Sequence, residues 1–365
     1  MAAGIKTGGV IYEATGQPGG ICRDYEKDGF KFSNGGPHWV FGKDAGLDYI
    51  KTLVEVKEYE RKAGVYYNHT FPYPFQSNFP KFSEFDEAVL KALNSGNFQG
   101  WLEENFGYEL CKMFFWPFNQ KYTAGLMADI IPQDTYKTPK TGTGWVSTFC
   151  DPVNGLSDLV NKMADKCTII YNNPAISIDT HNKLVKFKYT TEHYDRLIST
   201  IPLNKCLEMC GNTDFKLPYT SVLVINIGAE RGHSTPDEHW LYIPFCKSGF
   251  HRVSFYTNVD PTKAPQGKVG LSVEIAYKPD EIYGWRMKAF DVMKELQKWN
   301  WIGHVDTFSC DIVPCAYTWQ FDREYRQNAL NWLKERDITS TGRYGKWEFQ
   351  GLTASIMDGF SCEQA

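Results

Sequence analysis

The fold is decided by the stretch Val10-Ile11-Tyr12-Glu13-Ala14-Thr15-Gly16-Gln17-Pro18-Gly19-Gly20-Ile21-Cys22-Arg23. A short apolar strand that ends in an acidic residue is where a dinucleotide-binding βαβ unit places a carboxylate against a ribose. Glu13 takes that position, and a glycine turn and a cation follow it within ten residues. The stretch therefore predicts the second half of such a unit.

The first half of the unit has no counterpart in the sequence. Its glycine-rich phosphate loop lies about 20 residues before the acidic residue. No G-x-G-x-x-G precedes Glu13, and residues 1–9 have the pattern of a helix end that runs into a turn. We therefore expect the first strand and the phosphate loop to be absent. Since that loop supplies N–H donors and a helix N-terminus, dinucleotide affinity is expected to fall sharply.

Length and composition limit the class of protein. A chain of 365 residues has room for two domains, continuous or discontinuous. The net charge of −4 comes without any basic run, which argues against a nucleic-acid partner. The ten cysteines contain no C-x-x-C and the histidines show no ligand spacing, so we expect no metal. Without a signal peptide or a membrane-length apolar run, we expect a cytoplasmic protein that acts on a small molecule.

Hydrophobic periodicity predicts the elements. A β-hairpin over residues 53–67 is expected to turn at Ala63-Gly64, a helical insert to cover 82–127, and a loop to cover 137–144. Short strands are predicted at 167–171, 175–179, 184–189, 194–200, 221–227, 241–243, 252–257 and 271–277. Helices are predicted at 155–164, 285–301, 323–336 and from residue 353.

Two further glycine turns indicate a ligand close to the backbone. Gly35-Gly36-Pro37-His38-Trp39 is tight enough to approach a flat ligand. In Gly342-Arg343-Tyr344-Gly345-Lys346-Trp347, the arginine fork between two glycines suits bidentate contact with a pyrophosphate. A helix that begins near residue 353 would add free N–H groups. The alternative for this last stretch is a plain turn with an exposed arginine.

Taken in order, these segments resemble FAD-dependent flavoproteins of the amine-oxidase-like and protoporphyrinogen-oxidase-like type, and among them the eukaryotic type of UDP-galactopyranose mutase. The matching stretches are 13–23, 35–41, 72–78, 114–122, 240–244, 250–261 and 342–349. The resemblance implies an α/β fold with a discontinuous, Rossmann-like FAD-binding domain at 1–50, 145–215 and 335–365. It also implies a mixed α+β substrate domain at 51–144 and 216–334, which contains the helical insert.

The resemblance also implies site residues. Those expected to hold FAD are Glu13, Gly19, Gly20, Arg23, Gly36, His38, Trp39, Ala175, Gly342, Arg343, Tyr344, Gly345 and Trp347. Those expected to bind substrate are Arg252, Tyr317, Phe75 and Asn258. The alternatives are a solvent-facing strand arginine for Arg252 and plain core packing for Tyr317. No residue stands out as a general base.

Three departures from the mutase pattern bear on the substrate. Trp116, Val259 and Phe349 stand where the mutases carry an arginine and two tyrosines. A charged hydrogen bond contributes about 1.5–3 kcal/mol, so losing three such contacts is expected to weaken UDP-sugar binding by several orders of magnitude.

The expected function is therefore an FAD-dependent oxidoreductase that acts on a small organic or sugar-nucleotide substrate. One alternative is a mutase-like isomerase that uses reduced flavin. The other is a flavin-free fold that serves as a binding protein, and the missing phosphate loop favours it. On that reasoning the purified protein is expected to carry less than one flavin per chain.

Overall fold

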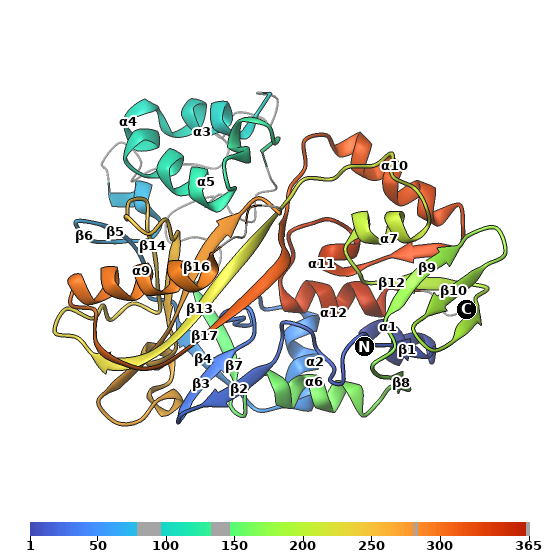
Figure 1. Ribbon diagram of the computed structural model, residues 1–365, viewed down its shortest axis with the longest axis horizontal. Helices are drawn as coiled ribbons and strands as arrows, with labels where there is room; N and C mark the ends of the chain where they lie inside the picture. The colour runs from blue at the N-terminus through green and yellow to red at the C-terminus, as the bar shows by residue number, and fades with distance from the viewer. Residues whose placement is uncertain (79–95, 133–146, 280, 282–283, 363–365) are drawn as a thin grey trace.

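The computed structural model describes residues 1–78, 96–132, 147–279, 281 and 284–362 (Figure 1). Its largest element is a seven-stranded sheet in the order β17-β13-β16-β15-β14-β5-β6. These strands are β5 (Ala63–Tyr67), β6 (His69–Pro72), β13 (Tyr219–Arg231), β14 (Trp240–Tyr242), β15 (Arg252–Phe255), β16 (Lys268–Tyr277) and β17 (Ile302–Thr318). The pairings are antiparallel except between β14 and β5.

The centre of this sheet is buried on both faces. Val222, Val224 and Ile227 on β13 form part of a run of β-branched and apolar residues, which suits a strand covered on either side. Helix α9 (Trp285–Lys298) packs across one face through Ala289 and Leu296, both fully buried. This sheet and α9 form the largest hydrophobic core of the described residues.

The helical insert lies beside one end of the sheet (Figure 1). It comprises α3 (Phe98–Phe106), α4 (Tyr108–Leu110), the π-helical turn η4 (Cys111–Phe115), α5 (Trp116–Tyr122) and the 3₁₀ turn η5 (Leu126–Ala128). Its aromatic residues join Val65 of β5 and Phe75 of the 3₁₀ turn η1 (Phe75–Asn78) in a separate core. The insert is therefore anchored to the edge of the sheet by rings rather than by strand pairing.

The other half of the molecule is built from short strands and helices (Figure 1). Two parallel pairs join β1 (Ile11–Tyr12) to β8 (Ile169–Ile170) and β12 (Leu197–Ser199) to β18 (Ile338–Ser340). A three-stranded antiparallel sheet contains β9 (Ala175–Asp179), β10 (Leu184–Phe187) and β11 (Thr191–His193). Parallel pairs with helices around them confirm the predicted α/β class.

Helices cover these strands. They are α1 (Ala2–Thr7), α2 (Ala45–Leu53), α6 (Leu156–Ala164), α7 (Leu203–Met209), α10 (Arg323–Lys334), α11 (Gly342–Gly345) and α12 (Leu352–Phe360). The remaining elements are β2 (Asp24–Lys27), β3 (Phe30–Ser33), β4 (Val56–Glu60), β7 (Thr148–Pro152), α8 (Tyr256–Val259) and η6 (Pro261–Lys263). Strand β2 pairs with β3, and β4 pairs with β7.

One predicted element is wrong. The hairpin turning at Ala63-Gly64 does not form, because β4 pairs with β7 and the turn that follows β5 lies at Asn68, which has φ of +62°. Gly64 lies inside a strand, where a Cβ would come within 2.9 Å of Leu241. Close packing rather than chain reversal requires this glycine.

The other predicted elements differ mainly at their ends. Strand β9 has the predicted bounds, and α6, α10 and α12 lie within one or two residues of theirs. The sequence analysis missed β17 entirely, although it is the longest strand. The predicted loop at 137–144 lies outside the described residues, as does the part of the predicted insert at 82–95.

Candidate functional site

A cavity of about 960 Å³ runs between the two halves of the molecule. Its described lining includes the carboxyl ends of both parallel pairs, the strands β13, β15, β16 and β17, and the helical insert. In open α/β sheets, ligands bind outside the carboxyl ends of parallel strands. The cavity therefore joins the predicted dinucleotide site to a second compartment at the large sheet.

Glu13 lies at one end of the cavity, directly after β1. One of its carboxylate oxygens, Oε1, accepts hydrogen bonds from the N–H of Thr15 at 2.8 Å and the hydroxyl of Thr15 at 2.7 Å. The second oxygen, Oε2, takes part in neither bond and can accept a ligand hydroxyl. Arg23 donates to the carbonyl of Gly20 at 2.9 Å and so closes the glycine turn.

The glycine turns give backbone access to the cavity. Gly20 and Gly342 both line it, both have positive φ, and neither would place a Cβ within 4 Å of another heavy atom. Helix α12 starts nearby at Leu352, with Gly351 as an N-cap that provides no side-chain hydrogen bond. Both of these residues line the cavity, so the first N–H groups of α12 are available to an anion.

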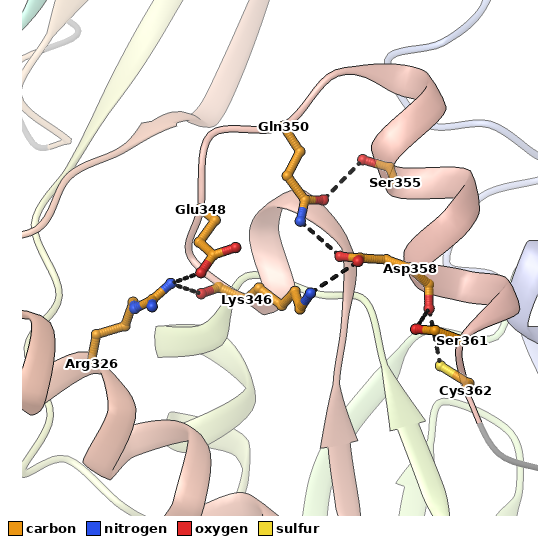
Figure 2. A network of polar contacts seen from close by, with 8 residues as sticks. All are labelled: Arg326, Lys346, Glu348, Gln350, Ser355, Asp358, Ser361 and Cys362. Atoms are coloured by element: carbon orange, nitrogen blue, oxygen red, sulfur yellow. Dashed lines mark hydrogen bonds and ion pairs between the residues drawn. The ribbon is translucent and has the colours of Figure 1, made fainter. Parts of the chain in front are cut away.

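A polar network fixes the segment between Gly342 and α12 (Figure 2). Asp358 accepts hydrogen bonds from Lys346 at 2.9 Å and from Gln350 at 2.7 Å. Arg326 on α10 binds the carboxylate of Glu348 and donates to the carbonyl of Lys346 at 3.3 Å. The segment is thereby held to both α10 and α12.

Arg343 points inward from this segment and lines the cavity. Its terminal nitrogens donate to the carbonyls of Gln350 at 3.3 Å and Ala316 at 3.1 Å, and its guanidinium lies 4.3 Å from the ring centre of Phe349. These two bonds use only two of the five N–H groups of the guanidinium, so contact with a pyrophosphate stays a prediction. The buried Nε has no hydrogen-bond partner among the described residues and can donate to a ligand.

His38 and Trp39 form part of the cavity wall after the second glycine turn. Burial, followed by the positive charges of Arg343 and Arg252, lowers the pKa of His38 to about 4. The imidazole is therefore neutral near neutral pH, and its Nε2 is buried with no partner in the described structure. Trp39 stacks on Trp240 with ring centres 5.1 Å apart.

A charged cluster stands where the cavity meets the large sheet. The Oε1 atom of Glu274 accepts two hydrogen bonds from Arg252, at 2.8 and 2.5 Å, and its Oε2 accepts one from the hydroxyl of Tyr317 at 3.1 Å. The Glu274 side chain is 3% exposed and that of Arg252 is 30% exposed. Antiparallel register brings this pair together, because Arg252 on β15 lies opposite Glu274 on β16.

The cluster also shifts the pKa of its members. Burial alone lowers the pKa of Arg252, but the charges of Glu274 and of nearby tyrosines outweigh it and hold this pKa above its ordinary value. Burial and the Glu274 carboxylate raise the pKa of Tyr317 well above that of a free tyrosine. The guanidinium therefore stays charged and the phenol stays protonated, which makes both of them donors.

Beyond this cluster the cavity is walled by the insert. The apolar residues of the insert that line it are Phe98, Leu102, Phe106, Phe114, Phe115 and Phe118. Tyr73 and Tyr242 add two rings from the edge of the sheet, 5.0 Å apart, and Arg61 lies 5.3 Å from the Tyr73 ring centre. This end of the cavity can hold a sizeable apolar group.

Most of the predicted site residues meet at the cavity. Those on its lining are Glu13, Gly19, Gly20, His38, Trp39, Arg252, Tyr317, Gly342, Arg343 and Tyr344. Those predicted but not on the lining are Arg23, Gly36, Phe75, Ala175, Asn258, Gly345 and Trp347. Phe75 and Trp347 have no exposed surface and belong to hydrophobic cores.

Asn258 is engaged elsewhere. Its amide nitrogen donates to the carbonyls of Pro236 at 2.8 Å and Glu238 at 2.7 Å, and its oxygen accepts from Arg231 at 3.2 Å. It therefore fixes a loop and does not contact the cavity, which corrects the expectation of a substrate contact.

The three positions that depart from the mutase pattern do not lie together in the structure. Phe349 lines the cavity beneath Arg343. Trp116 packs on Tyr108, with ring centres 5.4 Å apart, and Val259 is buried beside Trp39; neither is on the cavity lining. The structure thus places only one of the three in a position to contact a ligand.

Glu274 is the main candidate site residue that sequence reasoning missed. It is the one acidic residue in the apolar run Val269–Tyr277, between Val273 and Ile275. An isolated carboxylate in a strand buried on both faces requires a partner, and that pattern could have identified it.

Solved structures share this architecture. The crystal structure of reduced UDP-galactopyranose mutase is similar with a TM-score of 0.83 and 23% identity, and the match covers 96% of this chain and 86% of that one. An oxidoreductase from Methanosarcina mazei is similar with a TM-score of 0.68 and 14% identity over 98% and 95% of the two chains. Putrescine oxidase bound to putrescine gives a TM-score of 0.63 at 15% identity over 98% and 94%. At these identities the likeness establishes the flavoprotein-type fold.

Sequence comparison establishes the family. The family model of flavin containing amine oxidoreductases matches residues 9–283. The chain belongs to this family and is a flavin-dependent enzyme of the amine-oxidase-like superfamily.

Within the described ranges, two other features are absent. No helix there is both long and apolar enough to cross a membrane. No group of three or more His, Cys, Asp and Glu side chains in the same ranges could hold a metal ion.

Proposed function

We propose that this chain is an FAD-dependent oxidoreductase whose substrate binds at the Arg252 end of the cavity. The observation that carries the proposal is the single cavity that joins Glu13, Gly342 and Arg343 to Arg252 and Tyr317. In this proposal residues 1–50, 145–215 and 335–365 hold the cofactor. Residues 51–144 and 216–334 hold the substrate.

The chemistry of the lining fits FAD. The free oxygen of Glu13 suits a ribose hydroxyl, and the open backbone at Gly20 and Gly342 suits a close approach by a pyrophosphate. The first N–H groups of α12 add favourable dipoles for the phosphates. The Nε of Arg343 and the Nε2 of His38 are a buried donor and a buried acceptor that lack partners in the described structure, and a polar ring system would satisfy them.

The chain's own residues position the substrate. A bound flavin supplies the hydride acceptor for oxidation of a C–N or C–C bond. Arg252 and Tyr317 offer donors to a polar group of the substrate, and Glu274 fixes both of them. The rings of the insert exclude water from the same compartment.

Flavin binding provides the test. The purified chain is titrated with FAD, and protein-bound flavin is measured by visible absorbance and by quenching of flavin fluorescence. Arg343→Met removes a cavity cation and is expected to weaken FAD binding about tenfold or more. Arg336→Met is the matched control, because Arg336 stacks on Trp332, 3.8 Å from its ring centre, and is not on the cavity lining. Equal FAD affinity of the two variants would refute the assigned cofactor site.

A mutase-like isomerase is the second candidate, and the position of Arg252 and Tyr317 together on the cavity wall favours it. Both are donors that suit a nucleotide diphosphate. Calorimetric titration with UDP-galactose separates the two candidates. Tight binding supports the isomerase, and no binding leaves the oxidoreductase.

A further inference from the structure

The substrate end of the cavity has an unusual division between apolar and charged surface. Six apolar side chains of the insert line it, namely Phe98, Leu102, Phe106, Phe114, Phe115 and Phe118. The insert residues Asn119 and Tyr122 also line it, and the amide nitrogen of Asn119 donates to the carbonyl of Phe115 at 2.7 Å. Among the described residues, the insert therefore presents mostly hydrocarbon to a ligand.

The cavity wall across from the insert carries the positive charge of Arg252, whose N–H groups point in fixed directions. Arg252 uses Nε and Nη2 to bind Glu274, and neither of these hydrogen bonds involves Nη1. The Arg252 side chain as a whole is 30% exposed. A planar guanidinium with a free edge in a partly desolvated site matches a carboxylate better than it matches a hydroxyl or an amine.

The acidic residue of this site does not serve a cationic ligand. Both oxygens of Glu274 already accept hydrogen bonds, one from Arg252 and the other from Tyr317, and its side chain is 3% exposed. An ammonium group would therefore meet Arg252 without a free carboxylate to compensate it. Like charges brought together in a site of low dielectric repel each other, so an amine such as putrescine fits this wall poorly.

A nucleotide fits the wall formed by the helical insert poorly. The edges of a uracil ring carry donors and acceptors that lose water on burial, and only Asn119 and Tyr122 among the described insert residues on the lining carry polar side chains that could pair with them. Buried polar groups without partners weaken binding. The apolar part of a ligand belongs on the insert, and its anionic part belongs at Arg252.

We propose that the substrate is an amphipathic carboxylic acid, with its aromatic or branched apolar group on the insert wall and its carboxylate on Arg252. The inference rests on the proposed oxidoreductase function and narrows the substrate class of the same site. It separates this chain from the activities named for the similar structures, because it disfavours both polyamines and sugar nucleotides as ligands.

Four probes test the charge and the apolar requirement separately. The purified protein with its flavin is titrated by calorimetry with phenylpropanoate, phenylpropylamine, propanoate and uridine diphosphate. Phenylpropanoate is expected to bind at least about tenfold more tightly than each of the others, since each lacks either the carboxylate or the ring. Equal or tighter binding of the amine or of uridine diphosphate would overturn the inference.

Variants assign the effect to the two walls. Phe118→Ser is expected to weaken phenylpropanoate binding roughly fivefold to tenfold while leaving propanoate binding unchanged. Phe308→Ser is the control, because Phe308 is a half-buried ring on β17 that is not on the cavity lining. The double variant Arg252→Met/Glu274→Gln removes the pair without leaving a buried charge unpaired. It is expected to abolish the preference for the acid over the amine, and a preference that persists in this double variant would overturn the role of Arg252.

The same samples distinguish failure of the proposed oxidoreductase function from failure of the substrate-class inference. Their visible absorbance reports bound flavin, independently of any probe. If flavin is absent after FAD titration, the proposed oxidoreductase function fails and the inference fails with it. If flavin is bound and the acid shows no advantage, the inference alone fails.

Discussion

Replacing Glu274 with glutamine gives the most direct test of the site's electrostatics. The substitution removes the negative charge that accepts two hydrogen bonds from Arg252 and one from Tyr317. Breaking a buried ion pair costs about 3–5 kcal/mol when the remaining charge stays buried. Because Arg252 is 30% exposed and regains some hydration, we expect a smaller loss of about 2–4 kcal/mol in the free energy of unfolding.

The assay is a double-mutant cycle measured by thermal and urea unfolding. For a chain of 365 residues, a loss of about 3 kcal/mol corresponds to a fall in Tm of roughly 4 °C. Arg252→Met is also expected to destabilise, and the double variant is expected to lose less than the sum by about 1–3 kcal/mol. Additive losses would refute the coupling of these two side chains.

A surface ion pair serves as the control for this cycle. Glu230 and Lys268 lie 3.6 Å apart, and the Glu230 side chain is 55% exposed. Glu230→Gln is therefore expected to change stability by less than about 0.5 kcal/mol. If Glu274→Gln destabilises no more than Glu230→Gln does, the buried carboxylate is not needed to hold Arg252 and the reasoning fails.

Three further outcomes are expected. Burial, followed by the charge of Lys62, lowers the pKa of His239 from 6.5 to about 4, so its neutral form stabilises the fold above about pH 6.5 and stability falls as the pH drops towards 4. The free energy of unfolding measured in urea should lose about 2 kcal/mol from this group between about pH 7 and pH 5. A His239→Asn variant with an unchanged pH slope would contradict this. The Lys121 ammonium donates to the carbonyls of Ile243 and Phe250, so Lys121→Met should cost about 1–3 kcal/mol in the same assay, and a neutral effect would show that it does not anchor the insert. Backbone strain is expected to be similar in Gly342→Ala and Gly267→Ala, where φ is +74° and +78°, and to cost about 1–2 kcal/mol of stability in each. Only Gly342 lines the cavity, so only Gly342→Ala should also weaken FAD binding. Equal FAD affinities of the two variants would argue against a cofactor at that turn.

The sequence predicted local structure where the pattern was local. Strand β9 has the predicted bounds, and the start of α12 was placed within a residue of Leu352. The predicted hairpin is wrong because Gly64 serves close packing against Thr70 and against Leu241, which lies 177 positions away in the chain, and the sequence near Gly64 does not reveal the contact with Leu241. An alanine followed by a glycine gives the same local pattern whether the glycine forms a turn or packs closely inside a strand.

The candidate site was predicted in part, and its substrate residues only through resemblance. Arg252 and Tyr317 were named, and the structure places both on the cavity wall. Glu274 was not named, because its role depends on the antiparallel register that sets it opposite Arg252 and within reach of Tyr317. Strand register follows from the packing of the whole sheet and is not a property of either segment alone.

The glycine-arginine turn illustrates why a motif does not define its own geometry. Residues 342–347 carry the recognisable pattern, yet the hydrogen bonds that fix Arg343 end on Ala316 and Gln350, outside the pattern. Gln350 is in turn held by Asp358 on α12, within the network of Figure 2. The orientation of Arg343 therefore depends on a carboxylate fifteen residues later in the chain. The turn therefore brings to the cavity a guanidinium whose two terminal nitrogens each bind a backbone carbonyl, a buried Nε with no partner among the described residues, and an open glycine.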